Sequence, residues 1–161
     1  MNAQALESLN QRLRKLEDIE DIRTLRMSYH KFINEGLFDR FGELYTDDAV
    51  VEFDYVAKAK GIKEVRELFL RIPKNVDFVK QFIHNHMIEV NGDTATGLAY
   101  LDARYASNGE ALIVGARFSE KYRRTQAGWR ISETILKLYF SVPLSKGWAG
   151  TDIHHVQAYS K

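Results

Sequence analysis

The sequence contains no cysteine in 161 residues and only two prolines. Without cysteine there can be no disulfide bond, no thiolate nucleophile and no zinc site built on thiolates. No apolar run reaches the roughly 18 residues that a transmembrane helix needs, so no membrane association is predicted. The net charge of +1 lacks the basic excess that favours binding to nucleic acid or to an anionic membrane.

Cofactor motifs are absent as well. The sequence has neither a phosphate-binding loop of the P-loop type nor a dinucleotide-binding glycine pattern, and it has no H-E-x-x-H motif. We therefore predict no cofactor and no resident metal. Segment 1–21 is charged throughout and contains no apolar stretch typical of a secretory signal, so a cytoplasmic location is expected by elimination.

The most regular pattern that is present is an apolar stripe near the N-terminus, at steps of three or four residues. This spacing predicts one long helix, which ends at Gly36 because glycine readily adopts a left-handed cap. The first part of the stripe, Leu6–Leu16, is flanked by charged residues and is a candidate contact with a partner chain. The stripe consists of Leu6, Leu9, Leu13, Leu16, Ile19, Ile22, Leu25, Tyr29, Phe32 and Ile33.

A long β-hairpin is predicted over 81–105, because an alternating pattern leads to Asn91-Gly92, a dipeptide typical of two-residue hairpin turns. The remaining predicted elements are a helix over 37–45, a strand over 49–56, a loop over 57–61, a helix over 62–72 stopped by Pro73, strands over 111–124 and 129–142, and a tail from Pro143. Early helices and late, hairpin-linked strands indicate a single α+β domain over 1–161. Helices are expected to cover one face of a curved, mostly antiparallel sheet, forming a cone with an apolar pocket for a small molecule.

Two histidines on the rising arm of the hairpin are the main candidates for chemistry. His84 and His86 are two residues apart, so on a regular strand they share a face, with Gln81 on the opposite face. In the interior, one of them can act as a general base. The pair can also contribute to a metal site if a third ligand lies nearby, or form part of the outer sheet face or a dimer interface.

Three segments carry a resemblance to a known family: EDIRTLRMSYHKFINEGLFDRFGELYTDDAVVEF, HNHMIEVNGDTATGLAYL and ALIVGARFSEKYRRTQAGWRISETILKLYFSVPL. They resemble the SnoaL-like branch of the nuclear transport factor 2 superfamily, whose fold is a cone-shaped α+β barrel. The resemblance covers about 15–145, leaving an N-terminal helix extension and a C-terminal tail. Its enzymes include scytalone dehydratase, bile-acid 7α-dehydratase and hexachlorocyclohexane dehydrochlorinase, while other members bind small molecules without catalysis.

The resemblance implies a histidine base on the hairpin strand, oriented by an aspartate at the end of the first helix. Tyr29 matches a pocket tyrosine, whereas Asn34 stands at the aspartate position and Gln81 at the histidine position. Ala103 replaces a further aspartate. His84 lies three residues after Gln81, on the opposite face of a regular strand.

A one-residue β-bulge can rotate His84 or Asp102 inward. We therefore take His84 as candidate base, Tyr29 as the group that polarises a substrate oxygen, and Asn34 or Asp102 as the group that orients the base. Tyr105 also matches a pocket position, and Lys137 lies near a position that is basic in relatives. The candidate substrate-binding residues are Gln81, Tyr55, Ala103, Tyr105 and Lys137.

These expectations combine into a functional hypothesis. The chain is predicted to be a cofactor-independent lyase or isomerase of the dehydratase type, acting on a mostly apolar, oxygenated cyclic small molecule by general-base proton abstraction. The alternative is a non-catalytic small-molecule-binding or dimerisation module on the same fold, suggested by the substitutions at Gln81, Asn34 and Ala103. Either form is expected to assemble as a homo-oligomer, a dimer or trimer.

Overall fold

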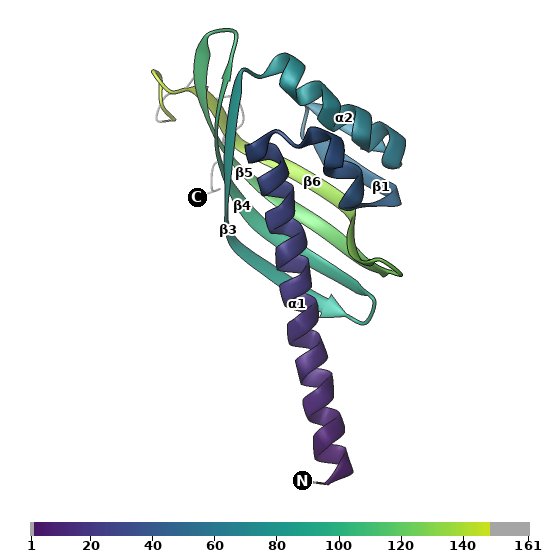
Figure 1. Ribbon diagram of the computed structural model, residues 1–161. Coiled ribbons are helices and arrows are strands. Elements are labelled where there is room, and N and C mark those ends of the chain that lie inside the picture. The colour runs from purple at the N-terminus through teal and green to yellow at the C-terminus, as the bar shows by residue number, and fades with distance from the viewer. Residues whose placement is uncertain (1, 149–161) are drawn as a thin grey trace.

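The computed structural model describes residues 2–148 (Figure 1). Most of the tail predicted after Pro143, from residue 149 on, lies outside the described residues. The elements are α1 (Ala3–Glu35), η1 (Phe38–Glu43), β1 (Tyr45–Phe53), β2 (Ala57–Lys60), α2 (Ile62–Asn75), β3 (Phe78–Asn91), β4 (Thr94–Ser107), β5 (Glu110–Thr125) and β6 (Gly128–Pro143).

The strands form one six-stranded sheet in the order β2-β1-β6-β5-β4-β3. Only β1 and β6 pair in parallel; the other neighbours are antiparallel. The predicted α+β fold with a curved sheet is confirmed, but the sheet is open, because β2 and β3 are its two edges and do not pair with each other. Helices α1 and α2 lie on the same face of the sheet (Figure 1).

Helix α1 is the single long helix that the apolar pattern predicted, but its apolar residues do not form one stripe. Leu6–Leu16 are exposed and lie roughly opposite the buried residues, which begin at Asp18. Asn2 caps its N-terminus by accepting a hydrogen bond from the Ala5 N–H at 2.9 Å. Gly36 ends it in the left-handed conformation at φ 71°, as expected of a glycine cap. The second half of α1 packs on the sheet, while the first half projects beyond it (Figure 1). No helix within residues 2–148 is long and apolar enough to cross a membrane.

Several local expectations were wrong. The hairpin turn lies at Gly92-Asp93 and not at Asn91-Gly92, because Asn91 pairs with Thr94. Tyr45, predicted as the end of a helix, is the first residue of β1.

The predicted loop over 57–61 contains the short edge strand β2, because Asp54 at φ 46° turns the chain back so that Ala57 pairs with Phe53. Pro73 does not end α2, which continues to Asn75. Proline at this position lacks the N–H that would bond to the Phe69 carbonyl, and α2 ends two residues later.

The core between the helices and the sheet is built around aromatic rings. Tyr29 of α1 makes edge-to-face contacts with Phe41, Phe69 and Phe118, at centroid distances of 5.1, 5.7 and 5.9 Å. Phe41 and Phe69 stack at 3.7 Å. These rings tie α1, η1, α2 and β5 together and hold the helices against one face of the sheet, here called the inner face.

Candidate functional site

A β-bulge in β3 decides which histidine reaches the inner face. His84 pairs with Tyr100 and Met87 pairs with Leu98, so β3 uses three steps where β4 uses two. The extra residue is accommodated at Asn85, which adopts φ 52°. As a result His84 is exposed on the outer face, whereas His86 is half-buried and turned inward. The expectation that the two histidines share a face was therefore wrong.

His86 contacts Tyr122 of β5 on the inner face of the sheet. Its Nε2 lies 3.1 Å from the Tyr122 hydroxyl oxygen. Gly97 of β4 makes this contact possible, because a Cβ atom at this position would lie 2.8 Å from the Tyr122 ring and 3.1 Å from His86 Nε2. The absence of a side chain at Gly97 thus opens the space in which the imidazole and the phenol meet.

The Tyr122 hydroxyl belongs to a buried network centred on Glu120. Tyr122 donates to Glu120 Oε2 at 2.5 Å, and Thr134 donates to Oε1 at 3.0 Å. Arg26 of α1 forms an ion pair with the same carboxylate at 2.8 Å, with both side chains almost fully buried. Tyr45 completes the group, since its hydroxyl lies 3.3 Å from Thr134 Oγ1.

This network assigns the tautomer of His86. The Tyr122 proton is used in the bond to Glu120, so the Tyr122 oxygen accepts from His86 and Nε2 must carry the hydrogen. The Nδ1 atom then holds the free lone pair of a neutral imidazole. Burial, and secondarily the positive charges of Arg26 and Arg23, lower the His86 pKa to about 4, so this neutral form prevails at pH 7.

A second imidazole, His30 of α1, is buried beside this network. Its ring contacts Tyr29 and Phe118 at centroid distances of 5.1 and 6.1 Å. Burial, followed by the charge of Arg26, lowers the His30 pKa to about 2, although interaction with the Gln81 side chain acts in the opposite direction. His30 is therefore neutral throughout the physiological range.

Several buried polar atoms around His30 lack a hydrogen bond of regular geometry to any described residue. They are both ring nitrogens of His30, Oε1 of Gln81, and Nε and Nη2 of Arg26. Buried polar groups are nearly always paired in folded proteins, so a group of such atoms marks a place where water or the polar atoms of a ligand bind.

Comparison with protein families identifies the domain. The model of the SnoaL-like domain matches residues 14–135, which is more than half of the chain. The chain belongs to the SnoaL-like family. It is similar to the uncharacterized protein Rv2910c of Mycobacterium tuberculosis, with 22% identity over 125 residues, covering 75% of this chain and 85% of that protein.

Solved structures show the same fold. An NTF2-like protein with a cystatin-like fold from Novosphingobium aromaticivorans has 28% identity and a TM-score of 0.71, covering 85% of this chain and 92% of that one. A type 2 hexachlorocyclohexane dehydrochlorinase (LinA) has 18% identity and a TM-score of 0.74, with 88% and 97% covered. A candidate scytalone dehydratase from Novosphingobium aromaticivorans has 12% identity and a TM-score of 0.76, with 91% and 97% covered.

In this SnoaL-like domain, Asn34 has a structural role. Its side-chain oxygen accepts from the Gln81 N–H at 2.7 Å, and its side-chain nitrogen donates to the Gln81 carbonyl at 2.9 Å. Asn34 thus holds the main chain of the edge strand β3. Its amide is directed at this main chain, and His84 lies on the opposite face of the sheet, so the structure does not bring Asn34 and His84 together.

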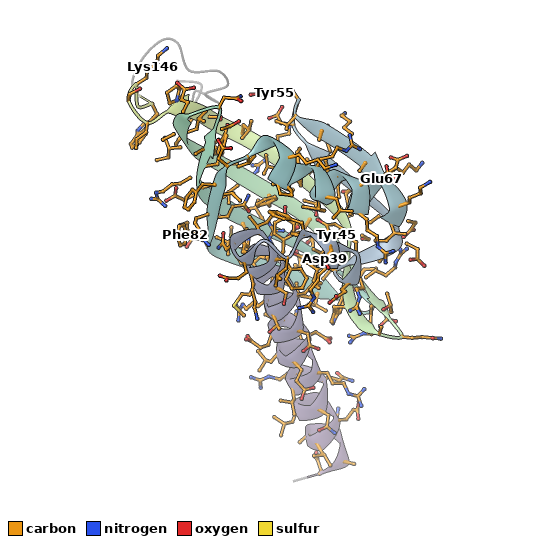
Figure 2. The ribbon with its side chains drawn as sticks, turned by 45° about the horizontal axis from the view of Figure 1, so that its top comes forward. Asp39, Tyr45, Tyr55, Glu67, Phe82 and Lys146 are labelled. Atoms are coloured by element: carbon orange, nitrogen blue, oxygen red, sulfur yellow. The ribbon has the colours of Figure 1, made fainter. Side chains whose placement is uncertain are left out.

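Three other predicted residues lie away from the buried network. Asp102 faces outward on β4 and pairs with Arg104 at 3.3 Å, so the bulge does not turn it inward. Lys137 is exposed on β6, opposite Arg117. Tyr55 lies in the turn between β1 and β2 with 61% of its surface exposed (Figure 2).

The remaining predicted residues do lie on the inner side. Tyr29 and Ala103 are buried in the core, and Gln81 is half-buried beside His30. The Tyr105 hydroxyl lies 3.1 Å from Ser141 Oγ. Burial is the main cause that raises the Tyr29 pKa above its ordinary value, which keeps its phenol protonated.

Sequence reasoning missed the centre of the network. Phe118, Glu120 and Tyr122 are two residues apart along β5, so their side chains point to the same face of the sheet. This places the Glu120 carboxylate on the apolar face. On α1, Arg26 lies four residues after Ile22, on the same side of the helix. In both cases the detectable signal was a charged residue at a position that the apolar pattern assigns to the interior.

Proposed function

We propose that this SnoaL-like domain is a cofactor-independent lyase or isomerase that abstracts a proton from a mostly apolar, oxygenated cyclic small molecule. The observation that carries the proposal is the contact of His86 with Tyr122 and, through it, with Glu120. A neutral histidine held in one tautomer, with a lone pair left on Nδ1, can accept a proton as a general base. Burial lowers the His86 pKa to about 4, so His86 is a weaker base than a free imidazole but a stronger one than His30. His86 thus replaces His84 as the proposed base.

The reaction begins when Nδ1 of His86 takes a proton from a substrate carbon. The electron pair of that C–H bond forms a double bond, either expelling a leaving group from the neighbouring carbon or moving into a conjugated carbonyl. In the first case His86 then gives its proton to the departing hydroxide or, when halide leaves, to water, and the product is that of a lyase. In the second, His86 returns the proton to another carbon and the product is an isomer. Glu120 stabilises the transient imidazolium through the Tyr122 hydroxyl.

The substrate oxygen has suitable partners near the base. Arg26 Nε and Nη2 are donors without a described partner, and the His30 nitrogens and Gln81 Oε1 add both donor and acceptor capacity. Because Glu120 balances the charge of Arg26, the site favours a neutral carbonyl or hydroxyl group over a strongly anionic one. The Arg26 guanidinium lies over the rings of Tyr29 and Phe118, at 4.2 and 3.9 Å from their centroids, so these rings position Arg26 beside the base.

The structural relatives are consistent with this class of chemistry. Loss of halide and loss of water are named for the dehydrochlorinase and for the candidate dehydratase that share the fold. Both reactions start with removal of a proton next to a leaving group. They support the reaction class, and the residues of this chain support the choice of base.

A second candidate function is small-molecule binding without turnover. It is favoured by Asn34, whose amide group is engaged with the Gln81 main chain, and by the buried His30, which is too weakly basic to accept a proton readily. This function requires the same buried polar atoms as ligand contacts. It differs from the first in needing no proton transfer to His86.

The test compares His86→Ala with His84→Ala in assays against cyclic alcohols, ketones and halides, with circular dichroism to confirm folding. General-base loss should reduce turnover by about 10²- to 10⁴-fold, whereas the outer-face control should retain it. Equal losses in both variants would contradict His86 as the base. Tight binding of a panel member by the wild type, with no turnover, would establish the binding function instead.

A further inference from the structure

The projecting half of α1 carries an exposed row of leucines. Leu6, Leu9, Leu13 and Leu16 are 48 to 64% exposed, although leucine is usually buried. Their steps of three, four and three residues match the first and fourth positions of a heptad repeat, the spacing of a two-stranded coiled coil. We call this row the leucine stripe.

The leucine stripe lies on the side of α1 that faces away from the sheet. The buried residues of α1 include Asp18, Ile22 and Tyr29, and at about 100° of rotation per residue they lie roughly opposite the stripe. Met27, which is 55% exposed, lies on the same line as the stripe further along the helix. A second helix can therefore lie along the stripe with the rest of each molecule on the outer side of the pair.

We propose that two copies of this chain associate through a parallel pairing of their α1 helices along the leucine stripe. In this arrangement each leucine packs against the same residue of the second copy, in two-fold symmetry. The contact requires little ordering, because α1 already extends as a helix from a second half that is packed on the sheet (Figure 1).

The charges beside the stripe favour the parallel direction. Arg12 flanks the stripe on one side and Glu17 on the other, five residues later in the chain. In a parallel pair these two positions of opposite chains are neighbours, so two ion pairs form by symmetry. An antiparallel pair that keeps the leucines in contact would instead bring the two Arg12 side chains together.

The paired region is short and ends before the sheet. The next core position of the repeat is Glu20, and a carboxylate there would face its own copy. Glu20 forms an ion pair with Arg23 on the same helix at 3.5 Å. The two helices therefore separate beyond Leu16, which leaves room for the two folded bodies.

Cysteine cross-linking tests the proposal without background, because the chain has no cysteine of its own. In a parallel pair Leu9→Cys places two thiols side by side, so mild oxidation should convert the protein to a covalent dimer. Ser8→Cys, one residue away on another side of the same helix, is the matched control and should react several-fold more slowly. Equal rates for the two variants would overturn the proposal.

Two further measurements separate the alternatives. If Leu9→Cys cross-links only when mixed with Leu13→Cys, the helices are antiparallel and the proposal is wrong. In sedimentation velocity at rising concentration, Arg12→Glu should weaken the dimer and Arg12→Glu combined with Glu17→Arg should restore it. A double variant no better than the single one, or a dimer that persists when Leu9 and Leu13 are both changed to Lys, would refute pairing through the stripe.

Discussion

The Asn34 side chain holds the main chain of Gln81 at both its polar groups, with distances of 2.7 and 2.9 Å. These two hydrogen bonds are of the kind that a neighbouring strand would make, and they lie at the open edge of the sheet, where main-chain groups are otherwise unpaired. The position that the family resemblance assigns to a catalytic carboxylate therefore serves here to attach the first helix to the hairpin.

Asn34→Asp should destabilise the fold without creating a catalytic dyad. The carboxylate keeps the acceptor for the Gln81 N–H but loses the donor and faces the Gln81 carbonyl oxygen. We expect a loss of about 1–3 kcal/mol in the free energy of unfolding, measured by urea denaturation. The matched control, Asn108→Asp in an exposed turn, should change it by less than about 0.5 kcal/mol; an equal loss there would remove the special role of Asn34.

Gly97→Ala tests the close approach of His86 and Tyr122. The added methyl group would lie 2.8 Å from the Tyr122 ring, so the ring, the imidazole or the strand must shift. Overpacking of this kind costs about 1–3 kcal/mol of stability and should also lower any turnover that depends on His86. Thr96→Ala, the neighbouring exposed residue of β4, is the control in the same denaturation assay, and a Gly97→Ala protein as stable as this control would contradict the packing argument.

Glu120→Gln should be among the most damaging single changes, because it leaves the buried Arg26 charge without its partner. We expect about 3–5 kcal/mol of destabilisation, measured by thermal or urea unfolding. Glu133→Gln breaks the ion pair of Glu133 with Lys121, which is more exposed but has a similar N–O distance of 3.0 Å. This change should lower the free energy of unfolding by no more than about 1 kcal/mol. Similar losses for the two variants would mean that burial does not determine the strength of these pairs.

The two inward histidines should make the protein acid-sensitive. The pKa is about 2 for His30 and about 4 for His86, below the 6.5 of an unfolded histidine. Between each of these values and pH 6.5, that histidine binds a proton in the unfolded state but not in the folded state. Stability is therefore complete above pH 6.5 and falls as the pH is lowered, by about 1.4 kcal/mol per pH unit for the buried His30. The partly exposed His86 contributes less.

This pH dependence can be measured by urea unfolding between pH 7 and 4.5. His30→Gln should flatten the fall in stability, because the unfolded state then has one proton fewer to gain. A His30→Gln profile as steep as that of the wild type would show that other groups cause the acid sensitivity.

The sequence was sufficient to predict the long helix, the existence of the hairpin and the fold class, because these follow from apolar periodicity and from local turn and cap residues. The two-residue turn was predicted at Asn91-Gly92 but lies at Gly92-Asp93, since Asn91 still pairs with Thr94. The strand β2 was missed because its Ala-Lys-Ala-Lys sequence lacks strand-forming residues, and only pairing with β1 makes it a strand. The Gly36 cap, by contrast, was predicted because glycine favours this conformation regardless of distant contacts.

The candidate site was harder to predict because it depends on contacts between distant segments. A bulge was anticipated in the hairpin, and it lies at Asn85, a residue type that tolerates positive φ. That it brings His86 to Tyr122 depends on the pairing of β3, β4 and β5, which no local pattern encodes. The pairing of Arg26 with Glu120 joins residues 94 positions apart. The inner positions of Tyr29 and Gln81 followed from the resemblance, but their neighbours did not.

The bulge at Asn85 also changes which residues of β3 face inward. Before it, Val79, Gln81 and Ile83 turn inward, at odd positions; after it, His86, Ile88 and Val90 do so, at even positions. If Asn85 were instead part of a regular strand, with no bulge, the odd positions would stay inward, sending Met87 and Glu89 to the interior and His86 to solvent. Deleting Asn85 would remove the bulge and still leave His86 inward, because His86 would then directly follow the outward His84. The conformation of one residue in a fourteen-residue strand therefore decides whether the hairpin contributes an imidazole to the inner face, beside the His30 that α1 supplies.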